Sequence, residues 1–427
     1  MLCVLASVRT DTKRPFETFV VLKRSKLSWD GTRVDAADTI KVAGKRSGAH
    51  ERVVQVMVIR VVYHPYPQVQ CWERKEHEVG GRGPHFDKIV LLRSCKGFKT
   101  IRVKNLPRLY ELQIALDAVD STALEISNVP NLGVFSFDLY LRSRFHPHLP
   151  FNAYAISLGS NVTQLRLAGV VTDNACLDAI KSGFPFLESL TLDLASWMLE
   201  SFHFTCASIK ILPLLSCPDI LIDVQVHAPK LKNFKFCGDT LPSLLFPVSS
   251  LNRLWLSLSL DLPFDANFFL KMREALVLSR ECYLDITTHN SELPFDMDMD
   301  DLRTRLLLPP ALNVQQLCFE TDEDDCLWER SPFFEAFFEI CHPRHVIPYP
   351  DISFSHNNHF CRLMLREVLE KKKKMMMTVT AYWPHYLKHV QIRQDPYQKW
   401  KTLTNSHRSF LDGSSPDVDL EFKLEWC

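Results

Sequence analysis

Cysteine and histidine gather in one part of the chain, where the first question is whether they bind a metal. The stretch reads Cys341-His342-x-x-His345, and His356-x-x-His359-x-Cys361 follows it, with Cys326 upstream. Structural zinc needs four Cys or His ligands in tetrahedral geometry, usually supplied as two close pairs. The spacing permits such a site. A helix end whose histidine interacts with the last carbonyl groups explains the same residues. We favour that simpler interpretation and assign no metal ligand.

Other residues that could do chemistry lack the pattern that the chemistry requires. The chain has 13 Cys and 16 His, but no motif places a base beside a thiol, as a cysteine nucleophile requires. The acidic run Asp322–Asp325 lacks the glycine and the terminal glutamate of a calcium loop. The run Lys371–Lys374 is typical of a solvated helix end, although phosphate binding or nuclear targeting would use the same residues. Trp383 and Tyr386 are interpreted as packing residues rather than as a platform for nucleic-acid bases.

A short apolar triplet recurs along the chain and indicates what could position these residues. The pattern is apolar-x-x-apolar-x-apolar, and alternation in a strand places the three apolar side chains on one face. It is typical of the strand core of a leucine-rich repeat. Its occurrences are Leu109/Leu112/Ile114, Leu132/Phe135/Phe137, Val162/Leu165/Leu167, Leu187/Leu190/Leu192, Leu199/Phe202/Phe204, Ile209/Leu212/Leu214, Leu231/Phe234/Phe236 and Leu251/Leu254/Leu256.

The spacing of the triplets predicts a repeat of roughly 20–29 residues. Two short steps, from Leu199 to Ile209 and from Leu187 to Leu199, indicate that some turns of the repeat are split in two. Proline precedes four of the triplets by two residues, and proline suits the approach to a strand better than its middle. These prolines are Pro107, Pro130, Pro185 and Pro229. The residues between the apolar positions are polar and should face outward: Gln164, Arg166, Glu188, Lys232, Lys235 and Arg253.

Helices are expected only at a few places. Asp173 is a suitable N-cap for a short helix with Leu177 and Ile180 on its inner edge, ended by Gly183 and Pro185. Further helices are expected within 264–279, 333–341 and 360–373, and strands at 98–103, 282–286, 314–319 and 387–392. Residues 292–301 are expected to form an acidic surface loop. An alternating pattern, Val418-Leu420-Phe422-Leu424, ends the chain.

Composition excludes several classes of function. Lys+Arg and Asp+Glu both number 50, so no global field favours nucleic acid or an anionic membrane. Only 13 of the 427 residues are glycine, which disfavours phosphate-binding loops. No apolar run approaches the roughly 20 residues that span a bilayer, and the N-terminus lacks a secretion signal. The cysteines have no paired spacing and are expected to be reduced, so we expect a cytoplasmic or nuclear protein, or both.

Two longer stretches resemble a known family. They are Phe184-Pro185-Phe186-Leu187-Glu188-Ser189-Leu190-Thr191-Leu192, and Ala228-Pro229-Lys230-Leu231-Lys232-Asn233-Phe234 with Cys237-Gly238-Asp239. Together with Cys341-His342-Pro343 and the segment 382–388, they are similar to plant F-box/leucine-rich-repeat proteins of the branch with an FBD-type C-terminus. The resemblance covers roughly residues 90–395.

The resemblance implies a substrate-recognition subunit of a cullin-type ubiquitin ligase, in which an F-box binds a Skp-family adaptor and the repeats hold the substrate. This chain departs from the family within residues 1–85, where we find no F-box signature. The stretch Val21–Trp29 is at best an echo of its end. Recruitment of a ligase is therefore in doubt even if the repeats are intact.

The predicted fold is α/β: a leucine-rich-repeat solenoid with a curved, mainly parallel sheet, short helices and loops on its convex side, and an FBD-like α/β cap. The predicted divisions are 1–85, a mildly basic segment with a degenerate or missing F-box; 86–320, the solenoid; 321–397, the cap; and 398–427, a polar tail. The predicted structural core comprises Leu109, Leu112, Leu132, Phe135, Leu165, Leu167, Leu187, Leu190, Leu192, Leu231, Phe234, Phe236, Leu251, Leu254 and Leu256.

The predicted function is a non-catalytic protein-binding scaffold without cofactor or metal. Its substrate is unknown, and its partners would be a Skp-family adaptor and a cullin if an F-box is present. A stand-alone interaction or decoy scaffold and a small-molecule co-receptor remain alternatives. An aspartate at Leu190 or Phe234 should bury an unpaired charge and collapse the neighbouring repeats.

Overall fold

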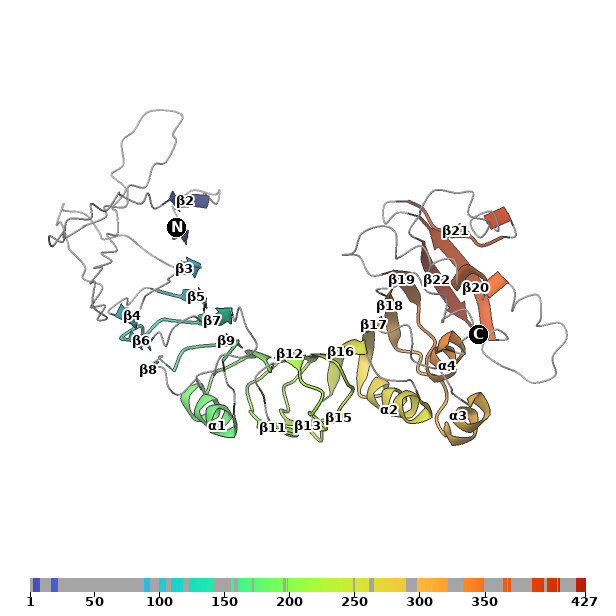
Figure 1. Ribbon diagram of the computed structural model, residues 1–427, viewed down its shortest axis with the longest axis horizontal. Helices are drawn as coiled ribbons and strands as arrows, with labels where there is room; N and C mark the ends of the chain where they lie inside the picture. The colour runs from blue at the N-terminus through green and yellow to red at the C-terminus, as the bar shows by residue number, and fades with distance from the viewer. Residues whose placement is uncertain are drawn as a thin grey trace, which may run out of the picture. The chain divides into compact units, whose positions relative to one another are not determined.

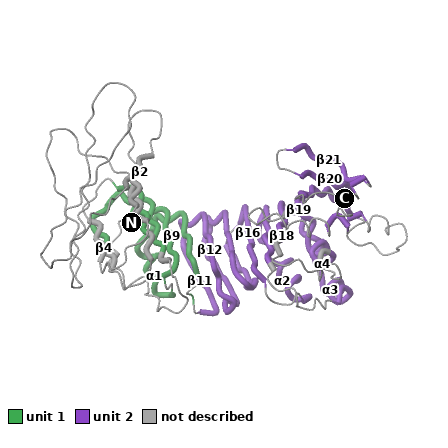
Figure 2. The backbone as a smooth tube through the Cα atoms, turned by 45° about the horizontal axis from the view of Figure 1, so that its top comes forward, with its two compact units in different colours: residues 1–198 green, residues 199–427 purple. Residues whose placement is uncertain are grey.

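The protein is α/β, with a large, mostly parallel sheet and few helices among its described residues (Figure 1). The computed structural model describes the following residues: 3–7, 17–21, 88–92, 100–104, 109–117, 123–140, 155–156, 160–170, 173–194, 197, 199–248, 250–260, 265–288, 298–321, 333–348, 364–366, 368–369, 386–394, 398–404, 406–407 and 420–427. The chain divides into two compact units, Met1–Met198 and Leu199–Cys427 (Figure 2). This division falls inside the segment 86–320 that the sequence predicts as one solenoid.

The first unit contains a main sheet with the strand order β2-β1-β3-β5-β7-β9-β10. β1 is antiparallel to both β2 and β3, and the strands from β3 to β10 are parallel to their neighbours. A second, parallel sheet has the order β4-β6-β8. The bounds are β1 Cys3–Ser7, β2 Glu17–Val21, β3 Lys88–Leu92, β4 Thr100–Lys104, β5 Glu111–Asp117, β6 Ala123–Ser127, β7 Val134–Tyr140, β8 Ala155–Ile156, β9 Gln164–Ala168 and β10 Ser189–Asp193.

The order of the strands differs from the simple series that the sequence suggests. The predicted strand at 98–103 exists as β4, but it belongs to the second sheet, and β3 precedes it in the main sheet. The chain therefore alternates between two sheets. Each turn uses one strand of either sheet, and this alternation is invisible in the apolar spacing because both kinds of strand bury alternate side chains.

One helix, α1 (Asn174–Gly183), lies in the first unit and confirms the predicted N-cap. The Asp173 carboxylate accepts a hydrogen bond from the Cys176 amide at 2.7 Å. Leu177 and Ile180 are buried, as expected, and the Phe184 amide caps the other end by donating to the Ile180 carbonyl. The cap satisfies one of the amides that a helix start leaves without a partner.

Asp173→Ala should therefore destabilise the first unit by about 1 kcal/mol. The matched control is Asp178→Ala in the same helix, whose carboxylate is 73% exposed and pairs only with Lys181. That control should change the free energy of unfolding by less than about 0.5 kcal/mol. Urea unfolding followed by circular dichroism measures both, and equal effects would contradict the cap.

The second unit repeats the two-sheet arrangement. Its main sheet has the order β12-β14-β16-β17-β18-β19-β22-β20-β21, parallel from β12 to β19, and its second sheet is β11-β13-β15, also parallel. The strands are β11 Ser201–Thr205, β12 Ile211–Cys217, β13 Asp223–His227, β14 Asn233–Gly238, β15 Ser243–Leu245, β16 Leu251–Leu260, β17 Ser279–Thr288, β18 Val314–Thr321, β19 His345–Pro348, β20 Leu387–Arg393, β21 Lys401–Thr402 and β22 Glu421–Trp426.

The register of the second unit measures the repeat directly. Ile211 is opposite Asn233, and Asn233 is opposite Arg253, which gives steps of 22 and 20 residues. In the second sheet, Ser201 is opposite Asp223, and Asp223 is opposite Ser243, with the same two steps. The closely spaced triplets at Leu199 and Ile209 thus belong to different sheets of one turn.

The core of the second unit lies between the two sheets and continues under three helices. Phe202 and Phe204 of β11 and Phe234 and Phe236 of β14 are all buried. The helices α2 (Ala266–Leu276), α3 (Met299–Arg305) and α4 (Phe333–Ile340) lie on the same side of the main sheet as the second sheet (Figures 1 and 2). An edge-to-face series of rings joins them to the sheet: Phe269 of α2, Phe337 of α4 and Phe319 of β18, with centroids 5.1 and 5.3 Å apart.

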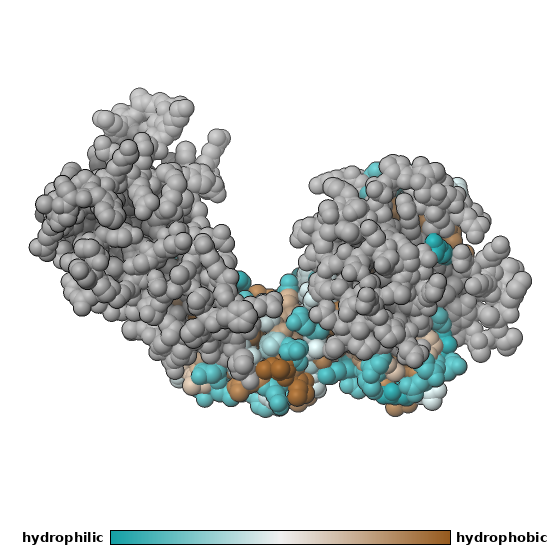
Figure 3. Space-filling model, viewed as in Figure 1, coloured by the Kyte–Doolittle hydropathy of each residue, from teal (hydrophilic) through white to brown (hydrophobic). Residues whose placement is uncertain are grey.

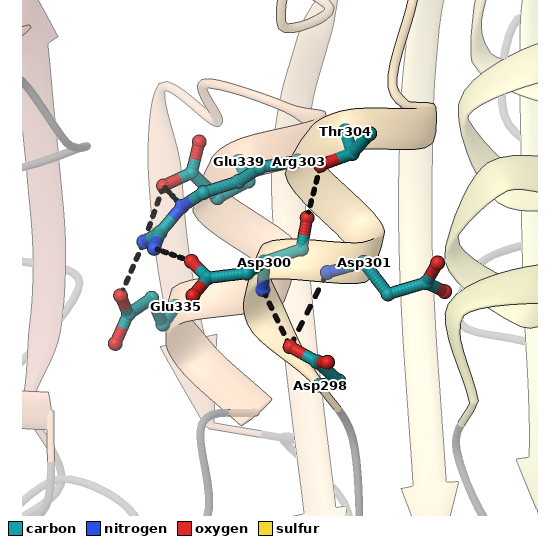
Figure 4. A network of polar contacts seen from close by, with 7 residues as sticks. All are labelled: Asp298, Asp300, Asp301, Arg303, Thr304, Glu335 and Glu339. Carbon is teal, nitrogen blue, oxygen red and sulfur yellow. Dashed lines mark hydrogen bonds and ion pairs between the residues drawn. The ribbon is translucent and has the colours of Figure 1, made fainter.

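The prediction of a surface loop over 292–301 is wrong at its end, because Asp298 begins α3. Its carboxylate accepts hydrogen bonds from the amides of Asp300 and Asp301. Arg303 of α3 then bridges to α4 through Glu335 and Glu339 (Figure 4). The carboxylates raise the pKa of Arg303 against the opposing effect of burial. The acidic pattern that suggested a loop is therefore an N-terminal cap with its counter-ions.

The end of the chain belongs to the sheet. β22 pairs antiparallel with both β19 and β20, and Phe422 and Leu424 are buried. The predicted polar tail 398–427 therefore includes a central strand, which its polar surroundings in the sequence concealed. Leu387, Val390 and Ile392 of β20 are buried as expected, but β20 has only antiparallel neighbours. Of the helix predicted within 360–373, the described residues Met364, Leu365 and Val368 are buried.

No helix among the described parts of the chain is long and apolar enough to cross a membrane.

Candidate binding surface

The outward face of the second unit's main sheet is the most extensive feature of the described residues that could hold a partner. Strand alternation places the buried leucines and phenylalanines on one face and the intervening residues on the other. One line of paired residues crosses eight strands, and we call it the central row. Its members, from β14 to β21, are Lys235, Trp255, Tyr283, Gln316, His345, Lys423, Gln391 and Thr402.

Trp255 forms the aromatic centre of this row. Its ring is stacked on Tyr283, with centroids 5.3 Å apart and planes 18° apart, and the Lys235 ammonium lies 5.0 Å from the ring centroid. Lysine near an indole face is attracted by the ring quadrupole. Trp255 nevertheless keeps 36% of its surface exposed. The three side chains hold one another in place, so a partner would meet a preorganised surface.

Charged side chains beside the row are mostly paired with one another. Arg253 donates to Glu281 at 3.0 Å, and Arg393 of β20 pairs with Glu421 of β22. The Trp255 indole donates to the Asp285 carboxylate, which is only 7% exposed. These pairs orient the side chains around the row and leave few unpaired carboxylates there.

A second aromatic group lies at the antiparallel end of the same face. Trp400 is 5.6 Å from the ring of His345, and the Arg393 guanidinium lies 4.5 Å from the Trp400 centroid. Burial, with Lys423 and Arg393 nearby, lowers the pKa of His345. A neutral imidazole at this place can donate and accept hydrogen bonds.

The described cysteines are unsuited to nucleophilic chemistry. Burial raises the pKa of Cys176 to about 12 and that of Cys282 to about 11, and it raises those of Cys237, Cys318 and Cys341 as well. A thiol acts as a nucleophile only as the thiolate. At neutral pH these five side chains therefore remain protonated and act as small apolar groups.

The candidate metal ligands are not brought together where they are described. Cys341 is fully buried, the His342 ring is stacked on Trp426 at 4.0 Å, and His345 lies in the central row. No group of three or more His, Cys, Asp or Glu side chains with suitable geometry occurs among the described residues. The other candidates, Cys326, His356, His359 and Cys361, lie outside those residues.

The remaining candidates from the sequence are placed as follows. Tyr386 is 43% exposed, with its ring 6.0 Å from that of His342. Asp322–Asp325, Lys371–Lys374 and Trp383 lie outside the described residues. Each of the fifteen predicted core side chains has at most 2% of its surface exposed. The six polar residues expected to face outward are exposed or half-buried.

Sequence reasoning missed the most distinctive residues of the surface. Trp255, Tyr283 and Asp285 all occupy outward positions, and the signal was present: Trp255 lies between Leu254 and Leu256, which are both buried. Alternation alone would have placed the indole outside. The pairing of Trp255 with Tyr283 depends on a register between strands that the sequence does not specify.

The second sheet shows a different surface. Ser201 and His203 of β11 both bond the Asp223 carboxylate of β13, which the Ser201 bond, followed by the His203 contacts, keeps at a lowered pKa. The serine hydroxyl contacts the carboxylate rather than the imidazole, so the three residues lack the order of a catalytic triad. Apolar side chains are also exposed near this sheet (Figure 3): Ile220, Ile222, Leu245 and Val248.

Comparison with known proteins gives no relative: no protein-family model, no curated protein and no solved structure matches this chain.

Proposed function

We propose that this chain is a non-catalytic protein-binding scaffold: a leucine-rich-repeat solenoid with an FBD-like cap, resembling the substrate-recognition subunit of a Skp–cullin–F-box ubiquitin ligase. The observation that carries the proposal is the register of the second unit, in which successive turns are 22 and 20 residues long. That length lies within the leucine-rich range. Repeat proteins of this kind bind partners on surfaces built from many turns.

The nature of the outward face also supports binding rather than catalysis. The central row combines tryptophan, tyrosine, lysine and amide side chains, and aromatic residues are enriched where proteins bind one another. The thiols that could act as nucleophiles are buried and protonated. Any change made to a bound substrate would then be performed by another subunit.

The ligase setting rests on the resemblance of the sequence, and one reconstitution tests it. The full chain should be co-expressed with a Skp-family adaptor and purified by a tag on the adaptor. We expect the two to co-elute in a fixed ratio on size exclusion, and Trp255→Ala to leave co-elution unchanged, because Trp255 lies on the substrate face. Separate elution at micromolar concentrations of both proteins would overturn the ligase role.

The absence of an F-box signature within residues 1–85 favours one alternative, a stand-alone or decoy scaffold that binds substrates without recruiting a ligase. Separate elution from the adaptor, together with retained folding, is the result expected of that alternative. A small-molecule co-receptor is the third possibility. Native mass spectrometry would identify it by a tightly held metabolite on the purified chain.

A further inference from the structure

Exposed side chains at the starts of the parallel strands of the second unit form a distinct edge. We call it the strand-start edge and define it by the residues that precede or begin β14, β16, β17, β18 and β19: Lys230, Lys232, Val248, Val277, Arg280, Leu312 and Arg344. All seven are exposed. They occupy corresponding positions in successive turns of the chain.

Hydrogen bonds between the turns keep this edge in order. The amides of Lys232 and Asn233 donate to the Lys210 carbonyl, and the amides of Asn252 and Arg253 donate to the Lys232 carbonyl. Further along, the Asn313 side chain donates to the carbonyls of Leu276 and Ser279 at 2.7 and 2.8 Å. The Arg344 amide donates to Val314. Neighbouring turns are therefore separated by the strand spacing, about 4.8 Å.

The charge of the edge is one-sided. Four of its seven residues are cationic, and no described carboxylate lies within ion-pair distance of Lys230, Lys232, Arg280 or Arg344. The one carboxylate at these strand starts, Glu281, is already held by Arg253. Opposite charges in the sequence as a whole are balanced, so this local excess is a property of the fold.

The remaining three residues of the edge are apolar. Val248, Val277 and Leu312 are 55%, 53% and 65% exposed. Exposed apolar side chains that stand singly are normal on a protein surface. Here they alternate with cations along one ordered edge, and a partner that covered them would gain apolar burial as well as charge neutralisation.

A nucleic acid fits this edge less well than a peptide does. Single-stranded nucleic acids are bound by rings that offer a free face for base stacking. The nearest tryptophan, Trp255, has Tyr283 stacked on its ring and Lys235 close to it. The neutral net charge of the chain is also unlike the strongly basic balance of nucleic-acid-binding domains.

We infer that the protein partner presents to the strand-start edge an extended, acidic segment with interspersed apolar side chains. The inference rests on the proposed scaffold function and names the chemistry of its substrate. Carboxylates of the segment would pair with Lys232, Arg280 and Arg344, and its apolar residues would cover Val277 and Leu312. Binding would weaken with added salt, because exposed charge pairs are screened.

Fluorescence anisotropy with the full chain tests this inference. The probe is a fluorescein-labelled synthetic peptide in which glutamate pairs alternate with single leucines. We expect Lys232→Glu with Arg280→Glu to weaken its binding at least about tenfold, or ~1.4 kcal/mol. The matched control reverses two exposed cations away from the edge, Lys399→Glu with Lys401→Glu, and should change the affinity less than about twofold. Thermal melts of both double variants check that they fold.

A second pair of probes separates the contributions. Replacement of the glutamates of the peptide by glutamine should weaken binding about as much as the charge reversal does. Val277→Ser with Leu312→Ser should weaken it about threefold and leave its salt dependence unchanged. Equal loss in the edge and control variants, or no loss in either, would overturn the inference. So would a labelled oligothymidylate that binds more tightly than the peptide and depends on the same two cations.

The outcome is independent of the adaptor experiment. Failure of the chain to co-elute with a Skp-family adaptor removes the ligase role but leaves peptide binding at the edge as expected. Loss of edge-dependent peptide binding removes the inference and leaves adaptor recruitment untouched.

Discussion

Phe234→Asp should unfold the second unit. The Phe234 ring is 2% exposed and meets Phe246 edge-to-face at 4.9 Å, in the core between β14 and the second sheet. The substitution removes the buried ring and places an unpaired carboxylate in its cavity, and each change alone costs several kcal/mol. We expect a total above about 4 kcal/mol, a large fraction of the stability of an ordinary domain.

The loss should extend to neighbouring turns, because each turn of a repeat contacts only the next. Hydrogen exchange followed by mass spectrometry would show lost protection in β12, β14 and β16. Lys232→Asp is the matched control: it introduces the same side chain two residues away at an exposed position. It should change the free energy of unfolding by less than about 0.5 kcal/mol. A Phe234→Asp protein with native protection in β14 would refute the described core.

The second large effect concerns pH and His342. This imidazole is 6% exposed, both ring nitrogens lack a hydrogen-bond partner among the described residues, and its ring is stacked on Trp426 with planes 7° apart. Burial lowers the pKa of His342 from 6.5 to about 4. The folded protein therefore keeps the histidine neutral at a pH where the unfolded chain protonates it.

The sign of the pH dependence follows from proton binding. Between pH 6.5 and about pH 4 the unfolded state binds more protons at this group than the folded state does, so stability decreases as the pH falls. It is fully present above pH 6.5 and levels off below about pH 4. A shift of this size corresponds to about 3 kcal/mol across the window. The lowered pKa of His345 adds a change of the same sign.

His342→Phe isolates this contribution, because it keeps an aromatic ring against Trp426 and removes the titrating nitrogens. Urea unfolding at about pH 7 and about pH 4.5 should show a loss for the wild type that exceeds the loss for the variant by about 2.5 kcal/mol. The residual loss in the variant includes that of His345. Equal losses in the two proteins would mean that His342 titrates as it does in water and is not buried.

Much of the fold could be predicted from the sequence because burial in strands leaves a period of two. The triplets containing Leu190, Phe234 and Leu254 placed their strands correctly, and Asp173 announced α1 through the demand of its first amides for a partner. The choice of sheet could not be predicted. Strands of both sheets bury alternate residues, so Phe202 of β11 and Leu212 of β12 look alike in sequence.

The candidate surface was predictable only in part. Outward positions such as Lys235 and Arg253 follow from alternation, but the stack of Lys235, Trp255 and Tyr283 joins residues 20 and 28 positions apart through strand register. β22 was missed for a related reason. Its two buried residues, Phe422 and Leu424, match a short edge strand in sequence, and only the pairing with β19 and β20 makes it central.

The central claim is a coil of turns 20 to 22 residues long whose strands stand side by side in register, and engineered cross-linking tests it most directly. Asn233→Cys with Arg253→Cys places two thiols at paired outward positions of β14 and β16. Neighbouring strands are about 4.8 Å apart, within the range that a disulfide spans. We expect mild oxidation of the full chain to join these two thiols, as peptide mapping by mass spectrometry would show.

The offset pair, Asn233→Cys with Ser257→Cys, is the control, because residue 257 lies opposite residue 237 and not 233. Its thiols are displaced by four residues along the strand, roughly 13 Å, and should not be joined. Selective cross-linking of the first pair is the result expected of the repeat coil. Failure of that pair to form, or equal formation in both pairs, would contradict the register from which the scaffold and its binding surface are derived.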